Sequence, residues 1–441
     1  MPLDPPSQAF VEPEAPKPVA AMPMQPKALS SQVYKPRFTL PPLAPVNRIA
    51  RPVSTPEYYH ASVATSGKTL EVTRENGFIL EGEGRVPAAR WLAALQAVSA
   101  INPGARLRMV GKRWESDGLP PRLRIIEEGA PHSDWDGRNS DGAGFLYENP
   151  LPLDTGPTVE LVVIHRPANK TLLVLRSHHA TMDGMGTMHF YLELFRALRG
   201  EPLVGTNAAF SDTDLMQSVG AKKSTSKHLK TAAMTGQPRG DEAGDEWRRI
   251  SLGKPRKNQL ARVADAVAEF ARQHSPQLSL LIGVPVDLRR HAPGLNSTAN
   301  YTNMILVRLD PGEGGEAFRL RLKEMLDQKM ETVYPRILEV FKWFSLRRLD
   351  LMLSRRESNY RTKKALETAV ISNLGRHEAA PLSGGGFTVE KFYVIPIKGS
   401  IFFGMACVND AVELTLNIPR VLASHGRFDA FAEHLTRKLA D

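Results

Sequence analysis

The sequence predicts a mixed α/β protein made of two lobes, and three observations point to this fold class. First, the chain has 441 residues, which exceeds the size at which a single hydrophobic core stops growing. Second, 42% of its residues are hydrophobic and 24% are charged, as in ordinary globular proteins. Third, β-rich runs and runs with helical spacing occur in both halves of the chain. We therefore expect two lobes of roughly 180 to 200 residues each, with room for a site between them.

A proline-rich tail is expected to precede the two lobes. The proline content of residues 1–56 disfavours helix and central strand and leaves extended or polyproline conformations. Residues 34–43 carry enough apolar side chains to lie along the folded body. The first lobe is expected over residues 57–240 and the second over residues 241–441.

The first lobe is expected to contain a helix, a β-hairpin and a second helix. Trp91, Leu95 and Val98 share one face of the first helix. Two β-rich runs joined by a short polar turn are typical of a hairpin. The predicted elements are helix 88–101, strands 158–165 and 171–177, and helix 188–198.

The second lobe is expected to follow a long polar connection, residues 206–246, which has few periodic apolar residues. Apolar runs and amphipathic segments then alternate. The predicted elements are helix 258–274, strands 278–286 and 301–309, helices 317–333 and 337–357, a strand-rich segment over 368–417, and helix 425–439.

The net charge of +10 and the pI near 9.6 raise the possibility of an anionic partner. The basic residues come as scattered pairs, with no recognisable nucleic-acid module around them. We therefore expect no nucleic-acid partner. Attraction for a small anion, such as the phosphates of coenzyme A, or for an acidic carrier domain is the alternative to a merely solvated basic surface.

Cysteine usage and hydropathy bear on the compartment. Cys407 is the only cysteine, so an internal disulfide is excluded, which fits a reducing compartment. It lies in an apolar run, where a buried packing role is expected. No segment approaches the length of about 20 apolar residues that spans a bilayer, and the start does not resemble a signal peptide. A cytoplasmic protein without a membrane span is expected.

Residues 178–184 read His-His-Ala-Thr-Met-Asp-Gly and lie between the second hairpin strand and the following helix. Acyl transfer from a thioester to a hydroxyl needs a base that removes the proton as the new bond forms. Histidine, with a reference pKa of about 6.5, is available as a neutral base near pH 7. Because the leaving group is a thiol, direct attack suffices. This segment predicts a histidine base for acyl transfer.

Each residue of this segment also has a structural interpretation. His178 follows an apolar strand and fits a buried structural histidine better than a second base. Asp183 either caps the following helix or pairs with an arginine that fixes the loop and aims His179. Gly184 is either a turn residue or leaves space for the thiol arm of the donor.

A metal site formed by His178, His179, Asp183 and His189 is the other chemical alternative. It is disfavoured because adjacent residues at a strand end point to opposite sides. We expect no bound metal and no permanently bound cofactor. The chain also lacks a Gly-x-Ser-x-Gly nucleophile elbow and a complete phosphate-binding glycine loop.

Residues 178–184 resemble the HHxxxDG signature of the coenzyme A-dependent acyltransferase superfamily. That superfamily includes nonribosomal-peptide condensation domains, chloramphenicol acetyltransferase, and polyketide-associated and alcohol acyltransferases. Residues 102–108, 151–157 and 285–289 are similar to family segments in order and spacing. The resemblance covers about residues 57–441 and leaves the proline-rich tail outside.

The resemblance implies two lobes like those of chloramphenicol acetyltransferase, enclosing a central tunnel with the second histidine at its middle. Carried over by position, His179 is the base, Asp183 the structural partner and Arg289 the ion-pair mate of Asp183. Residues 371–376 resemble a stretch of members that acylate alcohols, so Ser372 and Asn373 are candidates for oxyanion or substrate contacts. They are equally compatible with a turn at a strand end. The asparagines at positions 300 and 303, which flank a strand start, are similarly open to a structural or a binding role.

The catalytic candidates are therefore His179, Asp183 and His178, and the binding or structural candidates are Gly184, Arg289, Ser372, Asn373 and Asn303. The expected function is a stand-alone, monomeric condensation-type acyltransferase of secondary-metabolite biosynthesis. Its donor is a phosphopantetheine thioester on a carrier protein or coenzyme A, and its acceptor is an alcohol, slightly favoured, or an amine. The alternatives are a non-catalytic binding module with the same fold and a basic adaptor for nucleic acid or a membrane surface.

Overall fold

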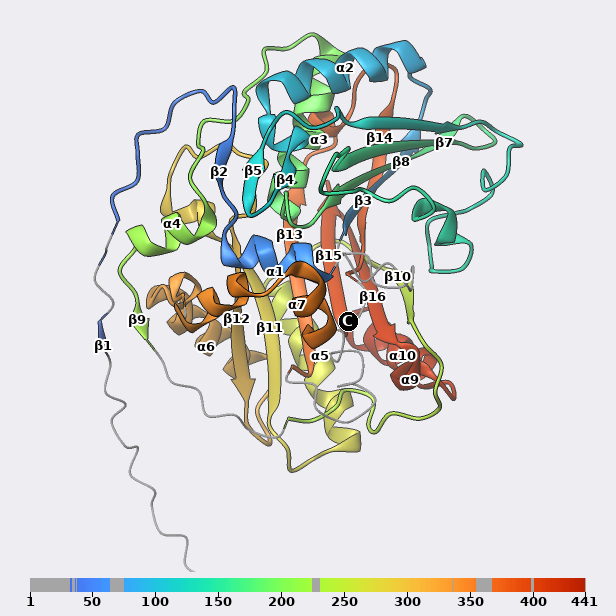
Figure 1. Cartoon of the computed structure of the whole chain (residues 1–441). Coiled ribbons are helices and arrows are strands. Elements are labelled where there is room, and N and C mark those ends of the chain that lie inside the picture. The colour runs from blue at the N-terminus through green and yellow to red at the C-terminus, as the bar shows by residue number, and fades with distance from the viewer. Residues whose placement is uncertain are drawn as a thin grey trace, which may run out of the picture.

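The computed structural model describes residues 32–33, 36, 38–63, 75–223, 231–334, 336–353, 367–397 and 400–440. Two large β-sheets, each covered by helices, form the body of the molecule (Figure 1). The mixed α/β fold class is therefore confirmed. Most of the expected tail, residues 1–31, and the end of the helix expected over 337–357 lie outside the described residues.

The first sheet has five strands in the order β14-β3-β8-β7-β6. The hairpin expected from the sequence is β7 and β8, which pair antiparallel, whereas β6 joins β7 in parallel. The strands are β3 (Glu75–Glu83), β6 (Arg122–Ile126), β7 (Val159–His165), β8 (Lys170–His178) and β14 (Thr388–Ile395).

Two helices cover one face of this sheet, α2 (Ala88–Ile101) and α3 (Gly184–Arg199). Trp91 and Leu95 of α2 pack with Leu194 of α3 in one apolar core, and Leu173 of β8 joins it. Helix α3 begins four residues earlier than the sequence pattern suggested, directly after the motif. The core therefore fixes the point at which the loop of residues 179–183 leaves β8.

The second sheet has six strands in the order β10-β16-β15-β13-β11-β12. Helices α5 (Gln259–His274) and α10 (Arg427–Ala440) pack against each other and share one core with these strands. The strands are β10 (Asp245–Gly253), β11 (Leu280–Asp287), β12 (Thr302–Leu309), β13 (Ala369–His377), β15 (Phe402–Val408) and β16 (Ala411–Pro419).

One strand passes from the second half of the chain into the first sheet. After β13 the chain leaves the six-stranded sheet, β14 pairs antiparallel with β3, and β15 then returns to pair with β13. The two sheets are thus joined by strand pairing as well as by packing. The proposed boundaries at residues 56 and 240 stay predictions.

A small third sheet and a short helix lie beside the motif loop. Strand β2 (Ala50–Pro52) pairs with β5 (Arg113–Glu115), which pairs with β4 (Arg108–Val110). Helix α1 (Thr55–Val63) follows β2 and contacts α7 (Leu346–Leu353), as Figure 1 also shows. Residues 49–55, which the sequence analysis assigned to the proline-rich tail, are therefore part of the folded body and contribute to the neighbourhood of the site.

Three expected elements differ from the structure. The polar stretch 206–246 holds a helix, α4 (Asp212–Ser218), which begins with a capping box between Ser211 and Asp214. The helix expected over 317–333 is α6 (Gly315–Asp327), which ends early because Lys329 adopts a left-handed conformation before a short 3-10 turn (Met330–Thr332). A 3-10 segment (Arg336–Trp343) precedes α7, whose start is marked by the Ser345 hydroxyl accepting from the Arg348 amide.

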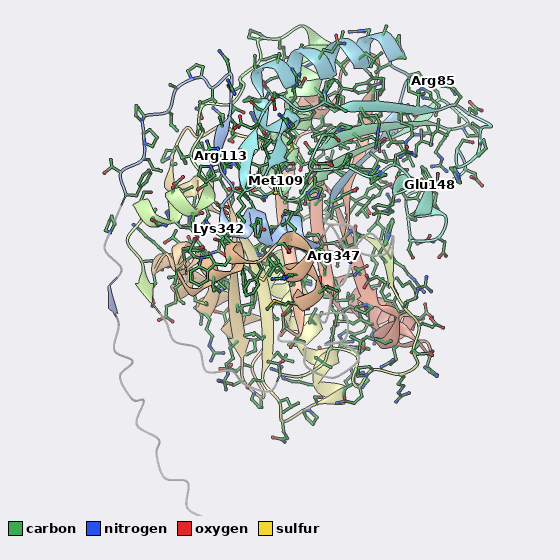
Figure 2. All side chains as sticks on the ribbon, viewed as in Figure 1. Arg85, Met109, Arg113, Glu148, Lys342 and Arg347 are labelled. Atoms are coloured by element: carbon green, nitrogen blue, oxygen red, sulfur yellow. The ribbon has the colours of Figure 1, made fainter. Side chains whose placement is uncertain are left out.

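Two expectations from the sequence, scattered basic residues and no membrane-spanning helix, can be compared with the structure. The labelled cations Arg85, Arg113, Lys342 and Arg347 are spread over one face and do not form one cluster (Figure 2). Within the described ranges, every helix is too short or too polar to cross a bilayer.

Candidate active site

His178 ends β8 and is completely enclosed by protein. Its Nδ1 accepts a hydrogen bond from the Ala180 amide at 3.0 Å, and its carbonyl oxygen accepts from the amides of Thr181 and Met182. Burial, followed by the neighbouring His179, lowers the pKa of His178 to about 3. A neutral ring that accepts through Nδ1 stabilises the turn, and His178 does not line the pocket described next.

His179 lines a pocket of about 130 Å³ between the two sheets. Phe78 of β3 and Ile395 of β14 come from the first sheet, whereas Asp287 of β11 and Ser372 of β13 come from the second. Most other lining side chains are apolar, namely Met185, Pro285, Leu374, Val394, Ile397 and Phe402. A tunnel through the whole molecule stays a prediction.

The Asp183 carboxylate holds the motif loop against the second sheet. It accepts from both terminal nitrogens of Arg289, at 3.0 and 3.1 Å, and from the Gly186 amide at 2.6 Å. The Tyr301 amide and the Thr302 hydroxyl donate to it at 2.7 and 2.8 Å. Asp183 therefore caps α3 and also forms the ion pair, so the two interpretations of this residue are compatible.

The charge balance around Asp183 favours its ionised form. Burial by itself would raise the pKa of this carboxyl, but the Arg289 charge and the hydrogen bonds outweigh burial and lower it. Burial likewise opposes the charge on Arg289, and Asp183 and Asp287 together raise its pKa. The guanidinium also donates to the Asp287 carboxylate at 2.9 Å and to the carbonyls of Ser297 and Ala299 at 3.1 and 2.6 Å.

Two glycines at the start of α3 lie close to neighbouring residues, Gly186 against backbone and Gly184 against a side chain. A Cβ on Gly186 would lie 2.1 Å from the carbonyl oxygen of Thr298, so α3 meets the loop before β12 without a gap. A Cβ on Gly184 would lie 3.1 Å from Leu374, in the pocket wall. Gly184 therefore begins α3 and also keeps the pocket open.

Both the backbone and the ring of His179 have defined neighbours. The Asn300 side-chain amide donates to the His179 carbonyl oxygen. The imidazole stacks on the ring of His60 in α1, with centroids 4.0 Å apart and an interplanar angle of 6°. His179 is half-buried and lines the pocket. Its side chain is thus held on one face and open to the pocket.

The remaining candidates divide between the pocket and the framework. Ser372 and Asn373 line the pocket, and the Asn373 side-chain oxygen accepts from the Gly375 amide at 2.9 Å. Asn303 lies elsewhere. Its amide nitrogen donates to the Glu331 carbonyl at 2.7 Å, so it joins β12 to the following 3-10 turn and does not reach the pocket lining.

Several residues around the site escaped the sequence analysis. Asn76 of β3 donates to the Met182 carbonyl at 2.8 Å and lines the pocket, as do Thr302 and Asp287. Burial raises the pKa of Asp287 against the opposing effect of Arg289. A polar residue two positions before the apolar run that starts at Phe78 was a signal for Asn76, but nothing in the local sequence marked His60.

The metal alternative is not supported by the geometry. His189 contacts the Asn102 side-chain oxygen at 3.2 Å, and the Asp183 oxygens already accept hydrogen bonds from protein donors. Among the described residues, no group of three or more His, Cys, Asp or Glu side chains has a metal-binding arrangement. Cys407, also named in the sequence analysis, is buried in β15.

No protein-family model matches the sequence, and the comparison with curated proteins gave no match. Solved structures, in contrast, match over most of the chain. The starter condensation domain of rhizomide synthetase, in complex with C8-CoA and Leu-SNAC, has a TM-score of 0.58 at 14% identity, covering 90% of this chain and 95% of that domain.

Two further condensation domains are similar. The first condensation domain of the calcium-dependent antibiotic synthetase, bound to a substrate analogue, has a TM-score of 0.60 at 17% identity, covering 88% of this chain and 95% of that one. The condensation domain of the monacolin K polyketide synthase has a TM-score of 0.57 at 13% identity, with 89% and 96% covered. The chain therefore has the fold of the condensation domains of nonribosomal-peptide and polyketide synthases, the fold that the HHxxxDG resemblance predicts.

Proposed function

We propose that the chain is a stand-alone condensation-type acyltransferase. It moves an acyl or peptidyl group from a phosphopantetheine thioester, carried by coenzyme A or a carrier protein, to an alcohol or amine acceptor. The observation that carries this proposal is the placement of His179, which faces a pocket between the two sheets while Asp183, Arg289 and Asn300 hold its loop.

The chemistry follows from a single base. The His179 imidazole takes the proton of the acceptor as its oxygen or nitrogen attacks the thioester carbonyl carbon. The tetrahedral oxyanion then collapses, the carbon–sulfur bond breaks, and the thiolate leaves with the proton from the imidazolium. Electrons and protons balance without a covalent enzyme intermediate. The thioester is a substrate, so no permanently bound cofactor is needed.

The pocket walls support a donor with an apolar acyl group. Phe78, Leu374 and Phe402 offer apolar surface, and the Ser372 hydroxyl lies in the same lining. A hydroxyl there fits a role as donor to the developing oxyanion. Ester formation is slightly favoured over amide formation, because residues 371–376 resemble the corresponding stretch of members that acylate alcohols.

The ligands of the structural neighbours are in line with this proposal. The rhizomide synthetase domain was crystallised with C8-CoA and with Leu-SNAC, which are thioesters or coenzyme A derivatives. Its fold agrees with that of this chain, and acyl transfer in general is the activity that this likeness supports. For this chain, the thioester donor and the alcohol or amine acceptor are supported by the apolar and hydroxyl side chains of its own pocket.

The test begins with acyl coenzyme A and acyl-loaded carrier proteins, incubated with the protein and a panel of alcohols and amines, with products identified by intact mass. Single-turnover transfer is then measured for His179→Ala with matched acceptors and saturating donor. We expect a loss of about 10²- to 10⁴-fold with alcohols and a smaller loss with amines, whose lone pair attacks before the proton is removed.

His425→Ala, which removes an exposed histidine, is the control and should keep parental rates. Equal rates for His179→Ala and the parent on every acceptor would remove His179 as the base. Saturable binding of thioesters without any transfer, by the parent and the variant alike, would instead favour the non-catalytic binding module.

A further inference from the structure

The imidazole of His60 lies parallel to that of His179, with ring centroids 4.0 Å apart and an interplanar angle of 6°. His60 belongs to α1, whereas His179 follows β8, so two separate elements bring the rings together. A histidine side chain rotates broadly about its second torsion angle, because that torsion ends in a planar ring. A parallel ring in contact restricts this rotation and defines the plane of the His179 imidazole.

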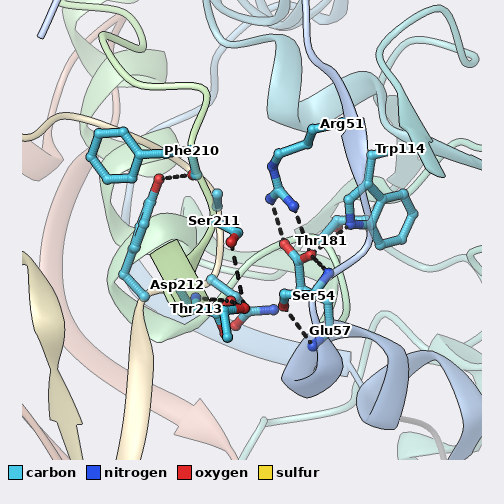
Figure 3. A network of polar contacts seen from close by, with 12 residues as sticks. Arg51, Ser54, Glu57, Trp114, Thr181, Phe210, Ser211, Asp212 and Thr213 are labelled. Carbon is cyan, nitrogen blue, oxygen red and sulfur yellow. Dashed lines mark hydrogen bonds and ion pairs between the residues drawn. The ribbon is translucent and has the colours of Figure 1, made fainter. Parts of the chain in front are cut away.

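Helix α1 is itself anchored by a buried polar network, drawn in Figure 3. The Glu57 carboxylate accepts from both terminal nitrogens of Arg51, at 2.8 and 2.6 Å. The Ser54 amide and the Trp114 indole donate to the same carboxylate at 2.8 and 3.0 Å. Glu57 and His60 are three residues apart and share one face of the helix.

Further contacts tie α1 to the motif loop. The Tyr58 hydroxyl donates to the Phe344 carbonyl at 2.8 Å, which fixes α1 against the segment that leads into α7. Tyr58 and Ala61 pack in one apolar cluster with Ala180, the residue directly after His179. The position of His60 in α1 is therefore set by the framework and does not depend on the stacking contact.

We propose that His60 is a positioning residue, which stacks on His179 and holds the base in the orientation needed to accept the proton of the acceptor. This inference rests on the proposed function. His60 acts through His179 and makes no contact with the reacting atoms. Its removal should therefore lower the rate of the proton-transfer step and leave the binding of the donor unchanged.

Three substitutions test this role, His60→Ala, His60→Leu and His60→Phe. Leucine fills much of the volume without a planar ring, and phenylalanine restores a ring that can stack. We expect His60→Ala and His60→Leu to lower kcat about 10- to 100-fold, the range associated with a misplaced catalytic group. The KM for the thioester should stay within about twofold, and His60→Phe should recover most of the parental kcat.

His132 provides a matched control, because its ring stacks on Phe145 with centroids 4.6 Å apart and an interplanar angle of 7°. It does not line the pocket, so His132→Ala should keep parental kinetics. Parental kcat in His60→Leu would overturn the proposal. Equal losses in His60→Leu and His60→Phe would overturn it too, since the ring plane would then not matter. These comparisons remain informative if His60→Ala fails to fold.

A second readout separates this proposal from the proposed function. In protein labelled with ¹³C-histidine, the His179 ring signal is identified by its absence in His179→Ala. Removal of the stacked His60 ring should shift this signal downfield, and an unchanged signal in His60→Leu would contradict the stacking. If the signal shifts but no thioester reacts, the proposed function fails while the contact holds. If His179→Ala is inactive but the His60 variants are fully active, only the positioning role fails.

Discussion

Two buried arginine–carboxylate pairs hold the elements that carry His179 and His60, and they differ in how far apart in the sequence their partners lie. Asp183 and Arg289 are 106 residues apart and connect the start of α3 to the turn after β11. Arg51 and Glu57 are six residues apart and connect β2 to α1. Both pairs are bidentate. The first joins the two sheets, whereas the second orients one short helix.

This difference in reach predicts different consequences for the two pairs. Asp183 accepts from residues of the second half of the chain, so its loss affects the contact between the sheets. The Glu57 network involves only residues close to α1 and the small third sheet. We therefore expect the long-range pair to contribute more to global stability, and the short-range pair to affect mainly α1.

The largest expected effect is that of Asp183→Asn. It leaves the buried Arg289 without its main counter-charge, and breaking a buried pair from one side typically costs about 3 to 5 kcal/mol. The free energy of unfolding from urea titration should fall by this amount, seen as a lower midpoint at unchanged slope. Asp134→Asn, at an exposed position, is the control. A variant with parental midpoint and full turnover would contradict the role given to Asp183.

Glu57→Gln should have a smaller effect, of about 3 kcal/mol or less. The reason is reach and not burial, because the two arginines are similarly enclosed, with 10% exposure for Arg51 and 12% for Arg289, but Glu57 connects only β2 and the small third sheet to α1. Tryptophan fluorescence during urea unfolding is the measurement, since the Trp114 indole donates to Glu57. Glu128→Gln, which breaks the exposed pair with Arg85, should change stability by about 1 kcal/mol at most. A loss equal to that of Asp183→Asn would remove the difference between the two pairs.

The smallest expected effect is a pH dependence at Asp212, which lies beside the Glu57 network (Figure 3). Burial and the Glu57 charge raise the pKa of Asp212 to about 7. The pKa of an unfolded aspartate is about 3.9, so the folded protein binds this proton more tightly than the unfolded chain. The resulting stabilisation is complete below about pH 3.9 and is lost as the pH rises toward 7. Asp183 behaves oppositely. Because its pKa is lowered in the folded state, its contribution to the free energy of unfolding is present above the unfolded pKa of about 3.9 and is lost as the pH falls further.

Asp212→Asn removes this titration. The free energy of unfolding of the parent should therefore fall by about 2.5 kcal/mol between pH 5 and pH 8 relative to that of Asp212→Asn. A constant difference between the two proteins across this range would show that Asp212 does not titrate there.

The elements predicted correctly are those whose own residues carry a strong periodic pattern. Helices α2 and α5 and the β7–β8 hairpin lie within two residues of their expected bounds. Helix α4 was missed because it is short and polar, although Ser211 and Asp214 have capping-box spacing. The pairing of β14 with β3 was not predictable, because periodicity identifies a strand but not its partner.

In the site, too, features set by nearby residues or by the family resemblance were predicted, whereas features set only by tertiary packing were not. The loop after β8 was expected from the strand and helix patterns on its two sides, and the pairing of Asp183 with Arg289 was expected through the family resemblance; the contact is present. The stacking of His60 on His179 depends on where α1 docks, which the Glu57 network and Tyr58 determine. Asn303 was placed among the candidates because it lies near a strand start, but its side chain points to the Glu331 carbonyl. Side-chain direction at a strand end depends on register, which the sequence alone did not specify.

The exchange of β14 has a consequence for synthesis of the chain. Strand β3 pairs with β14 along almost its whole length, yet β14 lies near the end of the sequence. During translation from the N-terminus, the β3 edge therefore stays unpaired until residue 395 has left the ribosome. An unpaired edge strand is a template for wrong pairing with other chains. Truncated products that end before β14 should accordingly aggregate, and a peptide spanning residues 388–395 should increase the yield of soluble fragment.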